Sequence, residues 1–213
     1  MKRQLSAFLI VMSFATFASA TEAINAKYKQ IGAATLGKPA GAEKAASGGG
    51  RVRLYANGGI WWSKTTGVHA VYGPTYTRYK SLRAERGKLG YPVTDVRPMP
   101  DGSAQTLFRH GYILVGASGT VTAEAMPEAT YTEDSVTLKK GMKVAMKSPT
   151  EALIEKLPQV PSGGATYSCD CLKPDNTLGT GKCDITTTSN VIRCAGAGCK
   201  NSCRLSLISG GGR

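Results

Sequence analysis

The chain has 213 residues, a formal net charge of +13 and 41% hydrophobic residues, which suffices for one or two ordinary domains with modest cores. After residue 20 no apolar run approaches the roughly 20 residues that a membrane-spanning helix needs, which argues against a membrane-spanning mature protein. The basic residues are scattered and never form a run of four, which argues against a dedicated polybasic patch.

Residues 1–20 have the three parts of a secretory signal sequence. Lys2 and Arg3 supply positive charge, residues 5–17 form an apolar stretch, and Ala18-Ser19-Ala20 is a small-residue cleavage site. The apolar stretch is too short to anchor the chain in a bilayer, and no cysteine beside the site could carry a lipid. We therefore expect cleavage after Ala20 and a secreted or periplasmic protein associated with the cell envelope.

Removal of Lys2 and Arg3 leaves a net charge of +11, of which +8 lies between residues 21 and 125. Such a surface attracts polyanions over a distance of about one Debye length. For an exported protein these are wall polymers, lipopolysaccharide or acidic glycans, so no nucleic acid partner is expected. The alternative is that the charge only keeps the protein soluble.

One unit of about 53 residues occurs twice. Leu36-Gly37-Lys38-Pro39 is matched by Leu89-Gly90-Tyr91-Pro92, and Ile60 by Ile113, at an interval of 53 residues. Each unit predicts a short amphipathic helix that ends at Gly32 or Gly87, then the Leu-Gly-x-Pro turn, a Gly-rich loop and an aromatic β-hairpin. The predicted hairpin strands are residues 51–55 and 60–62 in the first unit, and 104–108 and 112–115 in the second.

The stretches Gly59–Ser63, Thr66–Gly73 and Leu89–Asp95 resemble the LGFP repeat, with about two units over residues 24–122. LGFP repeats accompany secreted and surface proteins, including mycolyltransferases of corynebacteria, where they are thought to hold the protein to wall polysaccharide. The resemblance implies a non-catalytic binding or anchoring role. Since two units leave repeat faces uncovered, we expect either self-association or packing of the following segment onto them.

Residues 126–165 differ in composition from the repeats. The alternating run from Val136 to Met146 predicts a basic hairpin that turns at Gly141. Ser148-Pro149-Thr150-Glu151 has the pattern of a helix start, which predicts a helix through Leu157. The Pro/Gly-rich residues 158–164 then predict a linker.

All six cysteines lie after residue 165, in a segment with few apolar residues. In an exported chain they predict three disulfides that stabilise a small β-rich domain over residues 166–213. Zinc is the alternative, but the segment has no histidine and no Cys-x-x-Cys pair, so no metal is expected, and the missing pair also argues against a redox-active site. Fifteen pairings are open. The six residues are Cys169, Cys171, Cys183, Cys194, Cys199 and Cys203.

No catalytic residues are expected, because neither histidine belongs to a recognisable catalytic motif and no cysteine outside the cluster could act as a nucleophile. No cofactor is expected either. Flat aromatic faces can stack on sugars while neighbouring polar groups bond hydroxyls. The candidate ligand-binding residues on this basis are Trp61, Trp62, His69, Tyr72, Tyr91, Asp95, His110 and Tyr112. A core role is the alternative for each aromatic, and since Trp61 and Trp62 are adjacent, one is expected in the core and one exposed.

The predicted fold is α+β: two helix-plus-β-hairpin repeats packed together over residues 21–125, then the hairpin, helix and linker of residues 126–165, then the disulfide domain. The predicted function is non-catalytic binding or anchoring to cell-envelope polysaccharide. Two alternatives stay open: a secreted interaction factor, such as an inhibitor or toxin-like protein, that makes its contact through the disulfide domain, and a hydrolase with an unrecognised site.

Overall fold

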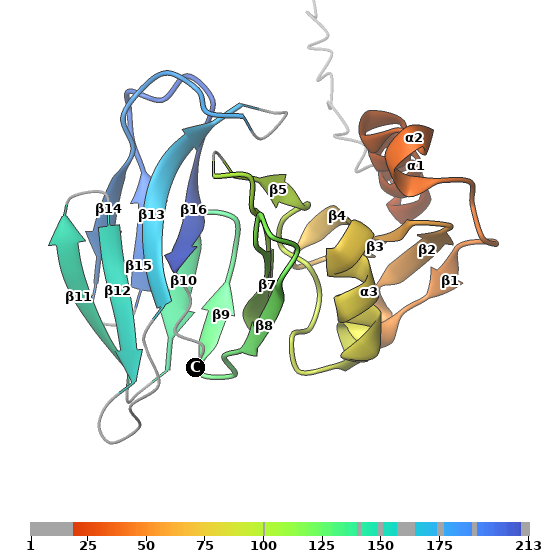
Figure 1. Cartoon of the computed structure of the whole chain (residues 1–213), viewed down its shortest axis with the longest axis horizontal. Coiled ribbons are helices and arrows are strands. Elements are labelled where there is room, and N and C mark those ends of the chain that lie inside the picture. The colour runs from red at the N-terminus through yellow and green to blue at the C-terminus, as the bar shows by residue number, and fades with distance from the viewer. Residues whose placement is uncertain are drawn as a thin grey trace, which may run out of the picture.

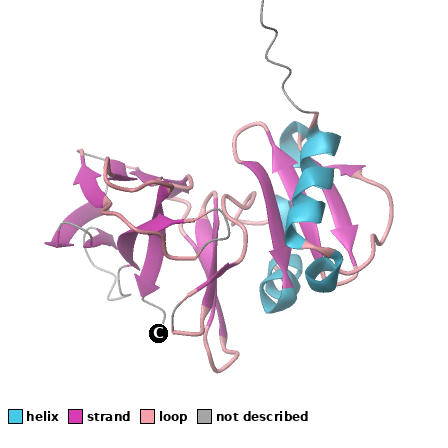
Figure 2. Ribbon diagram, turned by 90° about the horizontal axis from the view of Figure 1, so that it is seen from above, coloured by secondary structure: helices cyan, strands magenta, loops and turns pink. Residues whose placement is uncertain are grey.

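The computed structural model describes residues 19–99, 101–139, 142–148, 151–156, 165–173, 177–188 and 191–209. The predicted signal sequence, except Ser19 and Ala20, and the predicted linker at residues 158–164 lie outside these ranges. Figure 1 shows three parts in a row: a first sheet with helices, a second sheet, and a strand-rich C-terminal part. The helices gather in one half of the molecule (Figure 2). Among the helices described, none combines the length and the apolar character needed to cross a membrane.

The first part consists of two helices on a four-stranded antiparallel sheet. Helix α1 (Ala20–Ile31) begins with a capping box between Ser19 and Glu22. The helix ends before Gly32, as predicted. Its buried residue Ile24 faces the sheet, and the short helix α2 (Ala33–Leu36) follows. The strands pair in chain order and are β1 (Lys44–Ala45), β2 (Arg51–Tyr55), β3 (Gly58–Ser63) and β4 (Gly67–Tyr72).

The second part has the same sheet. Helix α3 (Gly73–Ser81) starts with a proline in its first turn and packs against the second sheet. It ends at Ser81 rather than at Gly87, because the chain turns at Leu82 and Gly87 instead ends a separate 3₁₀ turn, η2 (Ala84–Arg86). The strands again pair in chain order and are β5 (Arg97–Pro98), β6 (Ala104–Phe108), β7 (Gly111–Val115) and β8 (Val121–Ala125).

An equivalent backbone contact occurs in each of the two sheets, at the 53-residue interval found in the sequence. Pro39 bridges to Tyr55 in the first sheet, and Pro92 bridges to Phe108 in the second. Each predicted hairpin forms, but it is only the central pair of strands in a four-stranded sheet, so the prediction missed the two outer strands. The outer strands β1 and β5 have only two residues each, which gives too short a pattern to detect in the sequence.

The Leu-Gly-x-Pro turns are held the same way in both parts. The Tyr28 hydroxyl donates to the Gly37 carbonyl at 3.1 Å, and the Tyr79 hydroxyl donates to the Gly90 carbonyl at 2.7 Å. Gly37 and Gly90 have φ angles of +77° and +71°, a conformation that residues with a side chain rarely adopt. The glycine of this motif is therefore required by the turn itself.

Replacement of Tyr79 by Phe should lower the free energy of unfolding by about 1 to 2 kcal/mol, because it removes a hydroxyl of a fully buried side chain that donates to the Gly90 carbonyl. Tyr28→Phe is the matched control: Tyr28 is only half-buried, so water can replace its hydroxyl and the loss should be smaller. Urea unfolding of both variants measures the difference. Equal losses would contradict this assignment of the buried hydrogen bond.

The C-terminal part is formed by two four-stranded antiparallel sheets. Their strand orders are β14-β15-β10-β9 and β11-β12-β13-β16. Each sheet combines strands from residues 129–156 with strands from the cysteine-rich segment. The strands are β9 (Ala129–Tyr131), β10 (Ser135–Leu138), β11 (Met142–Ser148), β12 (Glu151–Lys156), β13 (Ala165–Leu172), β14 (Asp184–Thr187), β15 (Val191–Ala195) and β16 (Ser202–Ser209).

Two predictions for this region are wrong. The run from Val136 to Met146 is not a hairpin, because β10 pairs with β9 and β15 while β11 pairs with β12 in the other sheet. The predicted turn residue Gly141 lies outside the described residues. In the range predicted as a helix, Ser148 to Leu157, the described residues 151–156 form strand β12, which lies between β11 and β13 and buries Ala152 and Ile154 on one face. Tertiary pairing overrides the local helix-start pattern.

The C-terminal part packs onto the second sheet. One buried cluster joins Val93, Leu107 and Tyr112 of the second part to Tyr131, Tyr167 and the C-terminal cysteines. The backbone N–H of Tyr131 also donates to the Arg109 carbonyl at 3.0 Å. The segment after residue 125 therefore packs against the second part, as in one of the two alternatives expected from the sequence.

Candidate functional site

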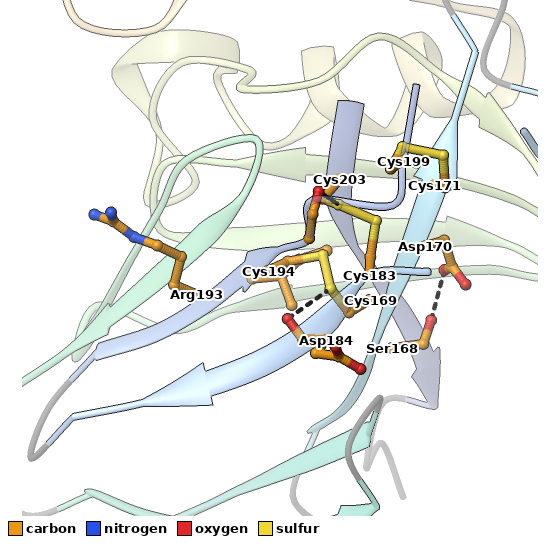
Figure 3. Close-up of a disulfide and its surroundings, with 12 residues drawn as sticks. Ser168, Cys169, Asp170, Cys171, Cys183, Asp184, Arg193, Cys194, Cys199 and Cys203 are labelled. Atoms are coloured by element: carbon orange, nitrogen blue, oxygen red, sulfur yellow. Dashed lines mark hydrogen bonds between the residues drawn. A yellow bond between two sulfur atoms is a disulfide. The ribbon is translucent and has the colours of Figure 1, made fainter. Parts of the chain in front are cut away.

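The six cysteines form three disulfides, as predicted. The pairs are Cys169–Cys194, Cys171–Cys199 and Cys183–Cys203. They connect β13, β15, β16 and the loops before β14 and β16 (Figure 3). The sulfur atoms of Cys171, Cys183 and Cys199 lie within 4.8 Å of one another, but all three are already bonded in disulfides and so are not thiolate ligands.

The candidate aromatic residues lie in or against the core. Trp61, Tyr91 and Tyr112 are buried, whereas Trp62 and Tyr72 are half-buried against the cluster below α1. Trp61 and Trp62 do face opposite sides of β3, but both sides are covered, so neither is exposed. The described residues include no exposed aromatic side chain.

The polar ends of these aromatic residues have partners inside the protein. Trp61 Nε1 donates to Glu85 Oε2 at 3.1 Å, and the Tyr112 hydroxyl donates to Glu124 Oε2 at 2.6 Å. Burial, followed by the hydrogen bond to Glu124, raises the pKa of Tyr112 well above its ordinary value. The Tyr91 hydroxyl donates to the Ser47 carbonyl, which links the two repeats. Each of these hydroxyl or indole groups is therefore already engaged.

Asp95 and His69 come together with Lys27. Asp95 Oδ2 accepts from Lys27 Nζ at 2.8 Å, and Asp95 Oδ1 accepts the Ala70 backbone N–H at 2.8 Å. His69 Nδ1 lies 3.7 Å from Asp95 Oδ1. Burial alone would raise the pKa of Asp95, but the neighbouring His69 imidazole and the charge of Lys27 outweigh it and lower this pKa to about 2. The carboxylate therefore ties α1 and β4 to the second part.

The two histidines have structural contacts. His69 Nε2 lies 2.6 Å from the Thr66 carbonyl, an atom that can only accept, so this nitrogen carries a proton. His110 Nδ1 lies 3.1 Å from the Ala129 carbonyl, at the contact between the second sheet and the C-terminal part. The nitrogen that faces each carbonyl holds the backbone, and this contact fixes the orientation of both rings.

A cleft of about 580 Å³ lies where three segments of the chain meet, and we call it the junction cleft. The turn between β3 and β4 forms one wall, and the segment from β9 to β10 together with the start of β16 forms the other. Of the predicted candidates only His69 lines it. Its lining residues are Thr65, Thr66, Gly67, Val68, His69, Val93, Tyr131, Thr132, Glu133, Asp134, Ser202, Cys203 and Arg204.

The junction cleft is rich in hydroxyl groups and has nearly balanced charge. Its threonine and serine side chains can both donate and accept hydrogen bonds. Arg204 Nη1 lies 3.4 Å from Glu133 Oε1, and Asp134 adds a second carboxylate. The cleft is therefore not positive, unlike the protein as a whole, and an uncharged ligand with many hydroxyls suits it better than a polyanion.

Sequence reasoning missed all of these residues except His69. They lie in turns and at strand starts, where Thr, Ser and Asp are common for conformational reasons and give no functional signal. Only the packing of the C-terminal part beside the first sheet brings the β3–β4 turn, residues 132–134 and residues 202–204 to one place.

Comparison with known families matches residues 36–87 to the LGFP repeat. The matched segment contains the first sheet, helix α3 and the turn η2. No curated protein matches the chain. The match and the three disulfides are consistent with a protein of the cell envelope or the extracellular space. The chain therefore carries an LGFP repeat at residues 36–87, followed by a C-terminal region with three disulfides.

Proposed function

We propose that the protein is a non-catalytic module of the cell envelope that binds an uncharged polysaccharide in the junction cleft. The observation that carries this proposal is the lining of the cleft, where three segments of the chain bring hydroxyl groups and charged side chains together. Sugars are recognised by such groups, which both donate and accept hydrogen bonds. The LGFP match supports the association with the envelope.

The balanced charge of the cleft separates this binding from diffuse attraction. The net charge of +11 on the mature chain, +13 less Lys2 and Arg3, would hold the protein to any anionic wall polymer, and that attraction weakens with salt. Hydrogen bonds inside a cleft that is lined by Glu133, Asp134 and Arg204 depend far less on salt. Specific binding is therefore the part of the retention that persists at high ionic strength.

A non-catalytic role is proposed because the polar groups nearest the cleft serve the fold. Asp95 is paired with Lys27 and has a pKa of about 2, so it is not poised to exchange a proton near neutral pH. His69 uses one ring nitrogen for the Thr66 carbonyl. No nucleophile with an adjacent base emerges among the described residues of the cleft.

The test is retention of the mature protein on insoluble envelope polysaccharide at about 1 M salt, where the Debye length is about 3 Å. Arabinogalactan is the uncharged probe, and purified peptidoglycan and an anionic wall polymer are the comparison probes. Ser202→Trp should abolish retention on the uncharged polymer, because Ser202 is exposed in the cleft and the indole would fill it.

Ser118→Trp is the matched control, since Ser118 is also exposed but lies in the turn between β7 and β8, away from the cleft. It should leave retention unchanged. If both variants bind like the parent protein, or if all retention disappears at high salt, the proposal is wrong.

A further inference from the structure

A second pocket lies between the second sheet and the C-terminal part, on residues that the proposed function does not use. It has a volume of about 440 Å³, and we call it the Arg97 pocket. Residues 97–99 at and after β5 form one wall, and residues of β13 and β16 together with Thr177 and Leu178 form the other. Its lining residues are Arg97, Pro98, Met99, Ser168, Asp170, Leu172, Thr177, Leu178 and Ser206.

Arg97 is an unusual residue for the wall of a pocket, because it is only 1% exposed. Its Nη1 donates to the Leu205 carbonyl at 3.0 Å, but Nε and Nη2 are buried and have no hydrogen-bond partner among the residues that the structure describes. A buried guanidinium with unmet donors is costly to the protein. Burial, followed by the charge of Arg204, lowers the pKa of Arg97 to about 10, so it stays charged at neutral pH.

The same pocket also has a carboxylate and an apolar wall. Asp170 accepts from the Ser168 hydroxyl at 2.7 Å and forms no ion pair with Arg97. Leu178 is 57% exposed, and with Met99 and Leu172 it forms the apolar side of the pocket. One cation, one anion and an apolar surface therefore share one cavity.

We propose that the Arg97 pocket binds a small zwitterion with an apolar side chain, of the amino acid or dipeptide class. Arg97 supplies the donors for the ligand carboxylate, which is the partner that its Nε and Nη2 lack. Asp170, oriented by Ser168, accepts from the ligand ammonium group. Leu178, Met99 and Leu172 cover the side chain.

The test is a titration of the mature protein, followed by amide NMR spectra, with leucine and with leucyl-leucine as the two probes. Two truncated probes are 4-methylpentanoate, which lacks the ammonium group, and 3-methylbutylamine, which lacks the carboxylate. At least one zwitterion should shift the amide signals of residues that line the pocket, and each truncated probe should bind at least about tenfold more weakly than that zwitterion. Stronger binding of the dipeptide than of leucine would assign the ligand to the peptide class, and the reverse to free amino acids.

Asp170→Asn and Leu178→Ala should each weaken the binding by about tenfold. Met146→Ala is the matched control for Leu178→Ala, because Met146 is also an exposed large hydrophobic residue, at 45%, but lies outside the pocket. Arg97→Gln should abolish the binding, and if that variant does not fold, the other two variants still decide. The proposal is overturned if neither zwitterion binds, if a truncated probe binds equally well, or if Met146→Ala weakens binding as much as Leu178→Ala does.

Discussion

Asp95→Asn should lower the free energy of unfolding by about 3 kcal/mol. The substitution keeps the size of the side chain but removes the charge that Lys27 Nζ contacts at 2.8 Å. The Lys27 side chain is only 13% exposed, so its ammonium group would remain largely buried without a counter-charge. Urea unfolding, followed by the fluorescence of the two tryptophans of β3, measures the loss where α1 and β4 meet.

Asp184→Asn is the matched control, because Asp184 is exposed in strand β14, and the change should stay within about 0.5 kcal/mol. A double variant, Lys27→Met with Asp95→Asn, should recover part of the stability, since no buried ammonium group is then left unpaired. A loss below about 1 kcal/mol for Asp95→Asn would contradict a structural role for this carboxylate.

Asp95 should also make the free energy of unfolding depend on pH in the acid range. The pKa of Asp95 falls from its ordinary value of 3.8 in the unfolded chain to about 2 in the folded protein. A lowered pKa stabilises the fold above pH 3.8, and this contribution, about 2 kcal/mol, is lost as the pH falls towards 2. The Asp95→Asn variant should lack this part of the acid dependence.

Replacement of both Cys169 and Cys194 by alanine should cost about 3 kcal/mol of stability. The two residues are 25 positions apart, and the bridge limits the freedom of that loop in the unfolded chain. Both are also buried in the cluster that joins the C-terminal part to the second sheet, where the smaller alanines leave space. Urea unfolding, followed by NMR signals of β13 and β15, measures the loss.

The tryptophans of β3 provide the internal control for this variant. Trp61 and Trp62 belong to two buried clusters that contain no cysteine, so their fluorescence in the absence of urea should not change. If the urea midpoint of β13 and β15 stays at that of the parent protein, the disulfide does not stabilise the C-terminal sheets as proposed.

The sequence predicts the repeated part well where the determinants are local. Strands β2 and β6 alternate in polarity, and Asn57-Gly58 marks the turn in the first sheet. The two Leu-Gly-x-Pro turns reveal the 53-residue interval, which the bridges Pro39–Tyr55 and Pro92–Phe108 then repeat. Each of these features depends on residues that lie close together in the chain.

Prediction from the sequence fails where the structure depends on contacts between segments that are distant in the chain. Residues 151–156 carry a helix-start pattern, yet they form β12 because β11 and β13 lie on both sides of them. The disulfide pairing could not be deduced either, since it depends on how β13, β15 and β16 are brought together. The junction cleft follows the same rule, because its walls come from residues more than 60 positions apart.

The junction cleft is tested most directly as the binding site by an amide NMR titration of the mature protein. The titrant is a soluble, uncharged fragment of envelope polysaccharide, added at high salt. Signal changes should gather at the β3–β4 turn, at residues 132–134 and at residues 202–204, and should disappear in Ser202→Trp. If the signal changes spread over the basic residues of the repeats, or if a large excess of the fragment causes no signal changes, the junction cleft is not the binding site.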